Sequence, residues 1–102
     1  MFYYKNSEKG KRLASEIQAA MVEVTGSPKR ISGASFRVLR ATQTLGVLIE
    51  CGFISNANER GQLQSSKYHQ KLAVKICDGL EKYREKYPED TINEEDYEKI
   101  LN

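Results

Sequence analysis

The strongest constraint on the fold is an unbroken apolar run, Leu45 to Ile49, in a chain of 102 residues of which 29% are charged. A run of this length is typical of a β-strand that is covered on both faces. We therefore expect it to lie at the centre of the domain, with the other elements arranged around it.

The chain before this run predicts a strand and then a helix. Met1 to Tyr4 is a short aromatic segment that can form a strand. Ser7 is a candidate helix N-cap, and Gly26 and Pro28 end the helix that follows. This segment is predicted to be amphipathic, because apolar residues recur in it at helical spacing. They are Leu13, Ile17, Ala20, Met21 and Val24.

A second strand is predicted between this helix and the apolar run. Lys29 to Ala34 is a basic loop, and residues 35–40 (SFRVLR) alternate apolar and polar side chains as a half-buried strand does. Phe36, Val38 and Leu39 are the candidates to face the core. A polar turn then leads into the apolar run.

Two helices are predicted after the run. Glu59 to Leu63 can form a short helix, and Ser65 or Ser66 can cap a longer one that Pro88 ends. The longer helix is amphipathic, with one apolar stripe that would face the sheet. The stripe consists of Tyr68, Leu72, Ile76, Leu80 and Tyr83.

The order strand, helix, strand, strand, helix, helix predicts an α/β domain in which helices cover a layered sheet. Three strands make a thin sheet for two amphipathic helices to cover. A chain of this length also buries only about two-thirds of its unfolded surface. We therefore expect an architecture that is only part of a complete layered sheet.

The net charge of +2 hides an asymmetry between the body of the chain and its tail. Residues 1–80 hold 12 Lys and Arg against 6 Asp and Glu, whereas residues 81–102 hold 4 against 8. The basic body favours an anionic partner such as cell-wall polymer or nucleic acid, although ordinary solvated helix faces give the same composition. Nucleic acid is the weaker candidate, because the aromatic residues are not interleaved with basic ones. In the tail, Thr91 to Glu94 has capping-box spacing and predicts a short peripheral helix.

Other classes of protein are disfavoured by the cysteines and by hydropathy. Cys51 and Cys77 are the only cysteines and form no CxxC motif, so we expect free, partly buried thiols instead of a disulfide scaffold or a zinc knuckle. No segment has the roughly 20 apolar residues of a membrane span. The first residues also lack the layout of a signal peptide. We therefore expect no membrane association.

Glu50 immediately follows the apolar run, and Cys51-Gly52 then allows the backbone to turn away. Ligand sites of open α/β sheets lie just beyond the carboxyl ends of strands. A carboxylate beside a buried strand is costly unless a cation, a proton or a hydrogen-bond donor compensates it. Three roles are open for Glu50: a structural carboxylate paired with an arginine such as Arg40, a metal ligand, or a general base beside a metal-bound water.

The string VLIECGFISNANERGQL, from Val47 to Leu63, resembles the signature of the zinc-dependent N-acetylmuramoyl-L-alanine amidases. These peptidoglycan hydrolases cut the bond between N-acetylmuramic acid and L-alanine. The likeness continues upstream in FYYKNSEKGKRLASEIQ and SFRVLRATQTLGVLIE, and downstream in YHQKLAVKICDGLEKY. It covers Met1 to Tyr83, and the sporulation-associated branch of the family is the most similar.

By this resemblance, residues 1–87 are the C-terminal half of the amidase catalytic domain, and residues 88–102 are an acidic tail. Glu50 would be the carboxylate that activates the zinc-bound water. The family's zinc ligands, two His and one Glu, belong to the half of the domain before Met1, so this chain would hold no metal ligand. The isolated chain is expected to be inactive until that half is supplied. Peptidoglycan is the implied substrate, and the cell wall or spore cortex is the implied location.

Further residues near the signature have alternative roles. Arg40 and Arg30 are candidates to bind the carboxylates of the stem peptide, and an internal ion pair to Glu50 or a solvated charge is the alternative. His69 is the only histidine and has no HxxxH partner, so a structural or surface role is favoured over metal binding. Gly52 is expected to provide the turn that directs Glu50 into a cleft.

The segment after Gly52 is expected to be structural. Asn56 and Asn58 are candidate caps of the short helix, and Phe53 and Ile54 are expected to anchor the loop in the core. The alternative function for the whole chain is a non-catalytic module of the amidase fold, which binds cell-wall glycan or a protein through the segment 29–40. An open sheet edge would also favour a homodimer.

Overall fold

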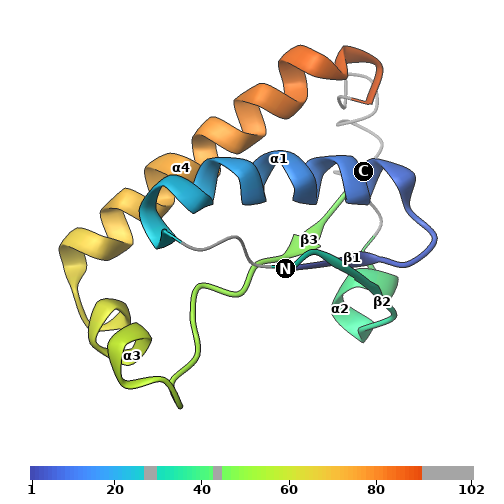
Figure 1. Ribbon diagram of the computed structural model, residues 1–102. Coiled ribbons are helices and arrows are strands. Elements are labelled where there is room, and N and C mark those ends of the chain that lie inside the picture. The colour runs from blue at the N-terminus through green and yellow to red at the C-terminus, as the bar shows by residue number, and fades with distance from the viewer. Residues whose placement is uncertain (27–29, 43–44, 91–102) are drawn as a thin grey trace, which may run out of the picture.

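The computed structural model describes residues 1–26, 30–42 and 45–90, which form a small sheet with helices packed on it (Figure 1). In chain order the elements are β1 (Phe2–Tyr4), α1 (Glu8–Thr25), β2 (Ser32–Ala34), α2 (Arg37–Arg40), β3 (Val47–Leu48), α3 (Ala57–Leu63), α4 (Ser66–Lys86) and the 3-10 turn η1 (Pro88–Asp90). None of the helices in these ranges has both the length and the apolarity needed to cross a membrane.

The sheet is mixed and has three strands in the order β2-β1-β3. The central strand β1 runs parallel to β2, with Phe2 opposite Ser32, and antiparallel to β3, with Tyr3 opposite Val47. A parallel pair needs a crossover connection, and α1 is part of the one between β1 and β2. The predicted α/β class and the number of three strands are confirmed, although one strand lies at a different place in the sequence.

The helix α1 begins and ends where the sequence indicates. The Ser7 side chain accepts a hydrogen bond of 2.9 Å from the Gly10 N–H, which satisfies a free donor of the first turn. Gly26 follows the last turn in the left-handed conformation, with φ 72°, and its N–H donates to the Val22 carbonyl. The side chains that α1 buries are Leu13, Ala14, Ile17 and Met21.

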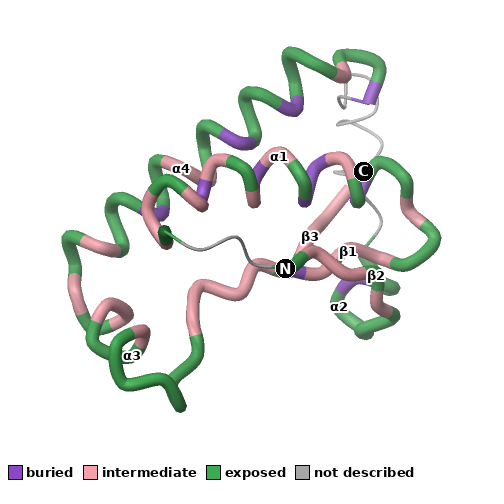
Figure 2. Tube along the Cα trace, in the orientation of Figure 1, coloured by how far each residue is buried: buried purple, intermediate pink, exposed green. Residues whose placement is uncertain are grey.

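The long helix α4 packs along α1 on the same side of the sheet, whereas α2 lies on the other side (Figure 1). The helix α4 begins after Ser65, whose side chain accepts a hydrogen bond from the Tyr68 N–H. Gly79 faces α1 so closely that a Cβ there would lie 2.5 Å from the Ile17 Cα. Leu80, which was predicted in the apolar stripe, is exposed because Gly79 occupies the facing position. Figure 2 shows buried residues along both helices, and the core comprises Met1, Leu13, Ala14, Ile17, Met21, Leu72 and Tyr83.

The prediction of a strand over residues 35–40 is wrong. The strand is β2, three residues earlier in the chain, and residues 37–40 form the short helix α2. Small side chains explain where the strand forms, because a Cβ at Gly33 would lie 3.1 Å from the Lys5 Cα and 3.3 Å from the Tyr3 ring. A glycine at position 33 therefore allows this close approach to β1 and to Lys5.

The predicted burial around the apolar run is wrong in two respects. Leu39 is buried as expected, but Phe36 and Val38 are exposed, because the short helix α2 buries only its Leu39 side chain. The run Leu45 to Ile49 includes the two-residue strand β3 and is covered on one face only, since Leu48 is exposed. The expected strand covered on both faces is therefore replaced by a strand that is covered mainly on the side of α1 and α4.

The C-terminal end of α4 is joined to α1 by a buried polar cluster. The Asp90 Oδ2 accepts hydrogen bonds from Arg12 Nε (3.1 Å), Arg12 Nη2 (2.7 Å) and the Tyr83 hydroxyl (2.8 Å). The Arg12 guanidinium also lies 5.0 Å from the centre of the Tyr87 ring. Burial alone would raise the pKa of Asp90, but these hydrogen bonds outweigh it and the pKa lies below its ordinary value. The helix predicted in the acidic tail falls in residues 91–102, outside the described residues.

Candidate active site

Glu50 lies just after β3, on the face of the sheet that is turned away from α1 and α4. Successive side chains along an extended chain point to opposite faces. Because alternate residues of this segment pack against the core, Leu48 and Glu50 between them point to the other face. The core-packed residues are Leu45, Val47, Ile49 and Cys51. We call the face that carries Leu48 and Glu50 the open face.

The Glu50 carboxylate lies beside the first residue of the chain. Its side chain is 38% exposed, and Oε2 lies 3.9 Å from the Met1 nitrogen. The same nitrogen donates to the Arg30 carbonyl at 3.2 Å. This position follows from the antiparallel register. Phe2 pairs with Leu48, so the residue before Phe2 lies near the residues that follow Leu48, which include Glu50. The Met1 nitrogen thus lies beside the carboxylate, while much of the carboxylate surface stays accessible.

The loop after Glu50 passes close to α3. A Cβ at Gly52 would lie 3.3 Å from the Leu63 Cδ1, and the φ of Gly52 is 159°, at the border of extended backbone. Its predicted role in directing Glu50 stays a prediction. Phe53 and Ile54 do not anchor the loop in the core, since they are 52% and 73% exposed. The prediction that these two apolar side chains hold the loop is therefore wrong.

Polar contacts with α3 hold the loop instead. The Asn56 Oδ1 accepts from the Glu59 N–H at 3.1 Å and caps the helix, as predicted. The Glu59 Oε2 accepts from the Phe53 N–H at 3.2 Å, and Arg60 Nη1 donates to the Ile54 carbonyl at 3.0 Å. Glu59 and Arg60 were not singled out from the sequence, although they belong to the amidase-like string.

The two candidate substrate-binding arginines occupy different positions. Arg40 ends α2 on the side of the open face, where it is exposed and its Nη1 donates to the Ser35 carbonyl at 3.2 Å. Arg30 is exposed, and its main chain lies near Glu50 through the shared contact with Met1. Within the described ranges no ion pair joins either arginine to Glu50. Both guanidinium groups are therefore accessible to a ligand.

The potential metal-binding side chains are dispersed. His69 lies in the first turn of α4, and its Nε2 contacts the Leu63 carbonyl, so the ring links α4 to α3. Cys51 is half-buried, whereas Cys77 is exposed, contrary to expectation, because it lies outside the stripe of α4 that faces α1. In the described part of the chain, no three His, Cys, Asp or Glu residues are grouped so as to hold a metal ion.

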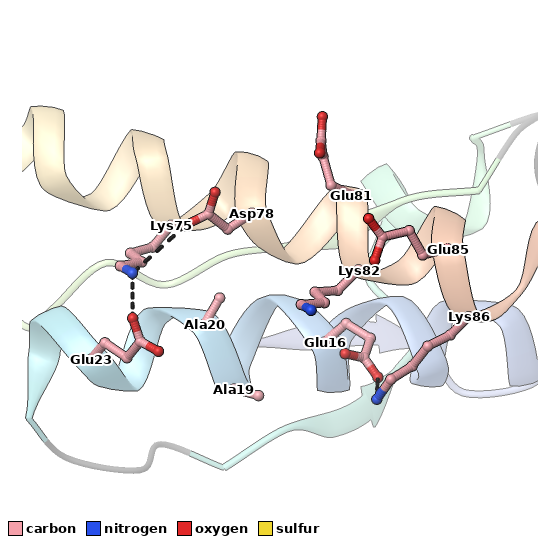
Figure 3. A pocket seen from close by; sticks show the side chains of 10 residues that line it. All are labelled: Glu16, Ala19, Ala20, Glu23, Lys75, Asp78, Glu81, Lys82, Glu85 and Lys86. Carbon is pink, nitrogen blue, oxygen red and sulfur yellow. Dashed lines mark hydrogen bonds and ion pairs between the residues drawn. The ribbon is translucent and has the colours of Figure 1, made fainter.

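A concave region lies between α1 and α4 and is lined mainly by charged side chains (Figure 3). Lys75 contacts Glu23 and, at 3.7 Å, Asp78, and Lys86 pairs with Glu16 at 2.8 Å. Exposed ion pairs of this kind contribute little to stability. The groove lies on the helix side of the sheet, so it is separate from Glu50, and we assign it no part in catalysis.

An α/β sheet with an accessible carboxylate just beyond a strand is an arrangement that hydrolytic enzymes use. A family model described as N-acetylmuramoyl-L-alanine amidase matches residues 1–82. The chain belongs to this amidase family. The family is generally zinc-dependent.

Three relatives from Bacillus subtilis (strain 168) cover similar shares of the chain. A protein named YqiI is 36% identical over 77 residues, which are 74% of this chain and 37% of that protein. The N-acetylmuramoyl-L-alanine amidase LytC is 35% identical over 74 residues, 72% of this chain and 15% of LytC. The germination-specific N-acetylmuramoyl-L-alanine amidase is 33% identical over 86 residues, 80% of this chain and 35% of that protein. The chain thus spans little more than a third of these relatives at most. No solved structure matches it.

Proposed function

We propose that the chain is the C-terminal portion of a peptidoglycan amidase that hydrolyses the bond between N-acetylmuramic acid and L-alanine. One observation carries the proposal: Glu50 follows a sheet strand, on the open face, with an accessible carboxylate. The family match over residues 1–82 supplies the reaction. The proposed domain comprises residues 1–87, and the acidic tail, residues 88–102, begins at η1.

Glu50 is proposed to move the protons of the reaction. Its carboxylate accepts a proton from the attacking water and later delivers one to the leaving amine. Zinc, which the family generally uses, would activate that water. The described part of the chain offers no set of three ligands, so the proposal assigns no metal ligand to it. It assigns the ligands to the part of the domain that precedes the matched segment.

Two further features complete the proposal. Arg40 and Arg30 are proposed to contact carboxylates of the stem peptide, because their guanidinium groups are exposed on or near the side where Glu50 lies. Peptidoglycan places the complete enzyme in the cell wall or spore cortex. The alternative is a binding module without catalysis, and it gives no role to the accessible Glu50 carboxylate.

The test joins this chain to the part that it is proposed to lack. The full chain, alone and fused at Met1 to the preceding part of the germination-specific amidase, is incubated with purified peptidoglycan and zinc, and newly released L-alanine amino groups are counted. We expect activity in the fusion only, and a loss of about 10²–10⁴-fold in Glu50→Gln. Glu23→Gln, on the exposed side of α1, is the control and should retain full activity.

Two results would contradict the proposal. Hydrolysis by the chain alone would show that the zinc ligands are wrongly assigned. A fusion that keeps full activity in Glu50→Gln would remove the catalytic role and favour the binding module.

A further inference from the structure

Glu50 lies in a short segment outside regular secondary structure. The register between β1 and β3 ends at Leu48, and the next helix is α3. Ile49 and Cys51 pack against the core and so determine the face to which Glu50 points. They do not determine the path of the chain after Cys51, because Gly52 has no side chain and glycine has the widest conformational freedom. The position of the Glu50 carboxylate therefore also depends on what holds the chain after Gly52.

The helix α3 holds that part of the chain at three points. A Cβ at Gly52 would lie 3.5 Å from the Glu59 Cβ, so the Gly52 backbone packs on α3. The Glu59 Oε2 accepts a hydrogen bond of 3.2 Å from the Phe53 N–H. Arg60 Nη1 donates to the Ile54 carbonyl at 3.0 Å. Two neighbouring residues of α3 thus bind the two ends of one dipeptide in the loop.

The helix α3 is itself joined to the long helix α4. Figure 1 shows α3 next to the beginning of α4. The His69 Nε2, in the first turn of α4, contacts the Leu63 carbonyl at the end of α3. The helix α4 in turn packs along α1 and contributes Leu72 and Tyr83 to the core. Contacts therefore lead from the core through α4 and α3 to the loop that follows Glu50.

The Glu59 carboxylate is suited to fix this loop. Apolar burial does not hold the loop, since Phe53 and Ile54 are exposed. An ionised acceptor forms a stronger hydrogen bond with an N–H than a neutral acceptor does. In an active site, a displacement of about 1 Å can lower the rate by about 10²-fold. Small movements of this loop would therefore matter for a carboxylate three residues before Phe53.

We propose that Glu59 is a positioning residue for Glu50. Its carboxylate holds the Phe53 N–H, and through this contact it keeps the segment from Glu50 to Phe53 in one conformation. This inference rests on the proposed function of Glu50 and adds a residue to the same site. Glu59 itself transfers no proton in this proposal.

The kinetic test measures kcat and KM in the fusion of the full chain with the preceding part of the germination-specific amidase. Glu59→Ala removes the acceptor, so kcat should fall by about 10–10²-fold while KM changes by no more than about twofold. Glu59→Gln keeps an oxygen that can accept from the Phe53 N–H, and its kcat should lie within about fivefold of the wild type. Arg60→Ala releases the Ile54 carbonyl and should lower kcat by about threefold at unchanged KM.

Ser65→Ala is the control for a loss of helix stability. Ser65 caps α4, so its loss destabilises the helix beside α3 but leaves the hydrogen bond between Glu59 and Phe53 in place. Its kcat should change by no more than about twofold. Amide hydrogen exchange of the full chain alone gives a readout that needs no activity. The Phe53 amide should exchange about tenfold faster in Glu59→Ala, and its exchange should be unchanged in Ser65→Ala.

The outcomes separate this inference from the proposed function. An active fusion that loses activity in Glu50→Gln but not in Glu59→Ala overturns the positioning role and leaves the proposed function standing. A fusion that is inactive, or that does not need Glu50, overturns the proposed function and the role of Glu59 with it. A rise in KM without a fall in kcat, an equal loss of kcat in Ser65→Ala, or a Glu59→Gln variant as slow as Glu59→Ala would each overturn the inference.

Discussion

Replacing Gly79 by alanine should force α1 and α4 apart. A Cβ at this position would lie 2.5 Å from the Ile17 Cα, 3.0 Å from the Ile17 nitrogen and 3.1 Å from the Glu16 carbonyl oxygen. Carbon atoms approach favourably to about 3.5–4.0 Å, so the helices would have to separate by about 1 Å. The atoms that clash belong to backbone, which cannot rotate away as a flexible side chain can. The separation would loosen the packing of the core residues Ile17 and Leu72.

The expected cost follows from two opposing effects. Overpacking a close contact costs about 1–3 kcal/mol, and a clash with backbone belongs at or beyond the upper end of this range. Alanine recovers about 1 kcal/mol relative to glycine inside a helix. We therefore expect Gly79→Ala to lower the free energy of unfolding by about 2 kcal/mol. Gly61→Ala in α3 is the control, because no atom lies within 4 Å of its Cβ, and it should gain about 0.5–1 kcal/mol.

Urea unfolding followed by far-ultraviolet circular dichroism measures both variants. With a slope of about 1.5 kcal/mol/M, the midpoint should fall by about 1.3 M in Gly79→Ala and rise by about 0.5 M in Gly61→Ala. The opposite signs matter more than the values, since both changes add the same methyl group to a helix. A Gly79→Ala variant as stable as the Gly61→Ala variant would refute the close crossing of α1 and α4.

Three further predictions concern polar contacts. In the fold the pKa of Asp90 lies below its ordinary value, so its stabilising effect is present above about pH 4 and lost as the pH falls through the folded pKa. In urea unfolding, the advantage of the wild type over Asp90→Asn should therefore decrease steadily as the pH falls below about 4. Burial and the hydrogen bond to Asp90 raise the pKa of Tyr83, so the stability that its protonated hydroxyl contributes is present below about pH 10 and lost at higher pH. The free energy of unfolding of Tyr83→Phe should therefore fall less than that of the wild type above about pH 10. Asn56→Ala should lower the free energy of opening of α3, measured by amide hydrogen exchange, by about 1 kcal/mol. Asn58→Ala should leave it unchanged, because Asn58 is not the N-cap residue.

The helices α1 and α4 were predictable because their signals are local. Ser7, Gly26 and Ser65 act within one turn of the residues that they cap, and each has the predicted role. The strand at β2 was not predictable in this way, because its small residues matter only once Gly33 lies against Lys5 of the neighbouring connection. Short strands depend on their partners more than on their own sequence.

The candidate site shows the same division. The position of Glu50 just after β3 could be anticipated, because an apolar run followed by a carboxylate and a glycine is a local pattern. The contacts that hold the loop after Glu50 could not be anticipated. Glu59 and Arg60 form hydrogen bonds with backbone atoms six residues earlier, and the positions of those atoms depend on how the loop folds. Phe53 was wrongly expected to be buried, because the apolar character of a residue does not determine how far the fold covers its side chain.

The buried polar cluster extends the folded body beyond the family match. The match ends at residue 82, but Tyr83 is part of the core and its hydroxyl donates to Asp90. Arg12 lies 78 residues away in the sequence and donates to the same carboxylate oxygen, so the end of the chain's described part is fixed to α1 near its beginning. A carboxylate with three hydrogen bonds is stable when buried, whereas one without them is not. The hydrogen bonds of Arg12 and Tyr83 to Asp90 therefore join the segment after α4 to the first turns of α1 within this chain.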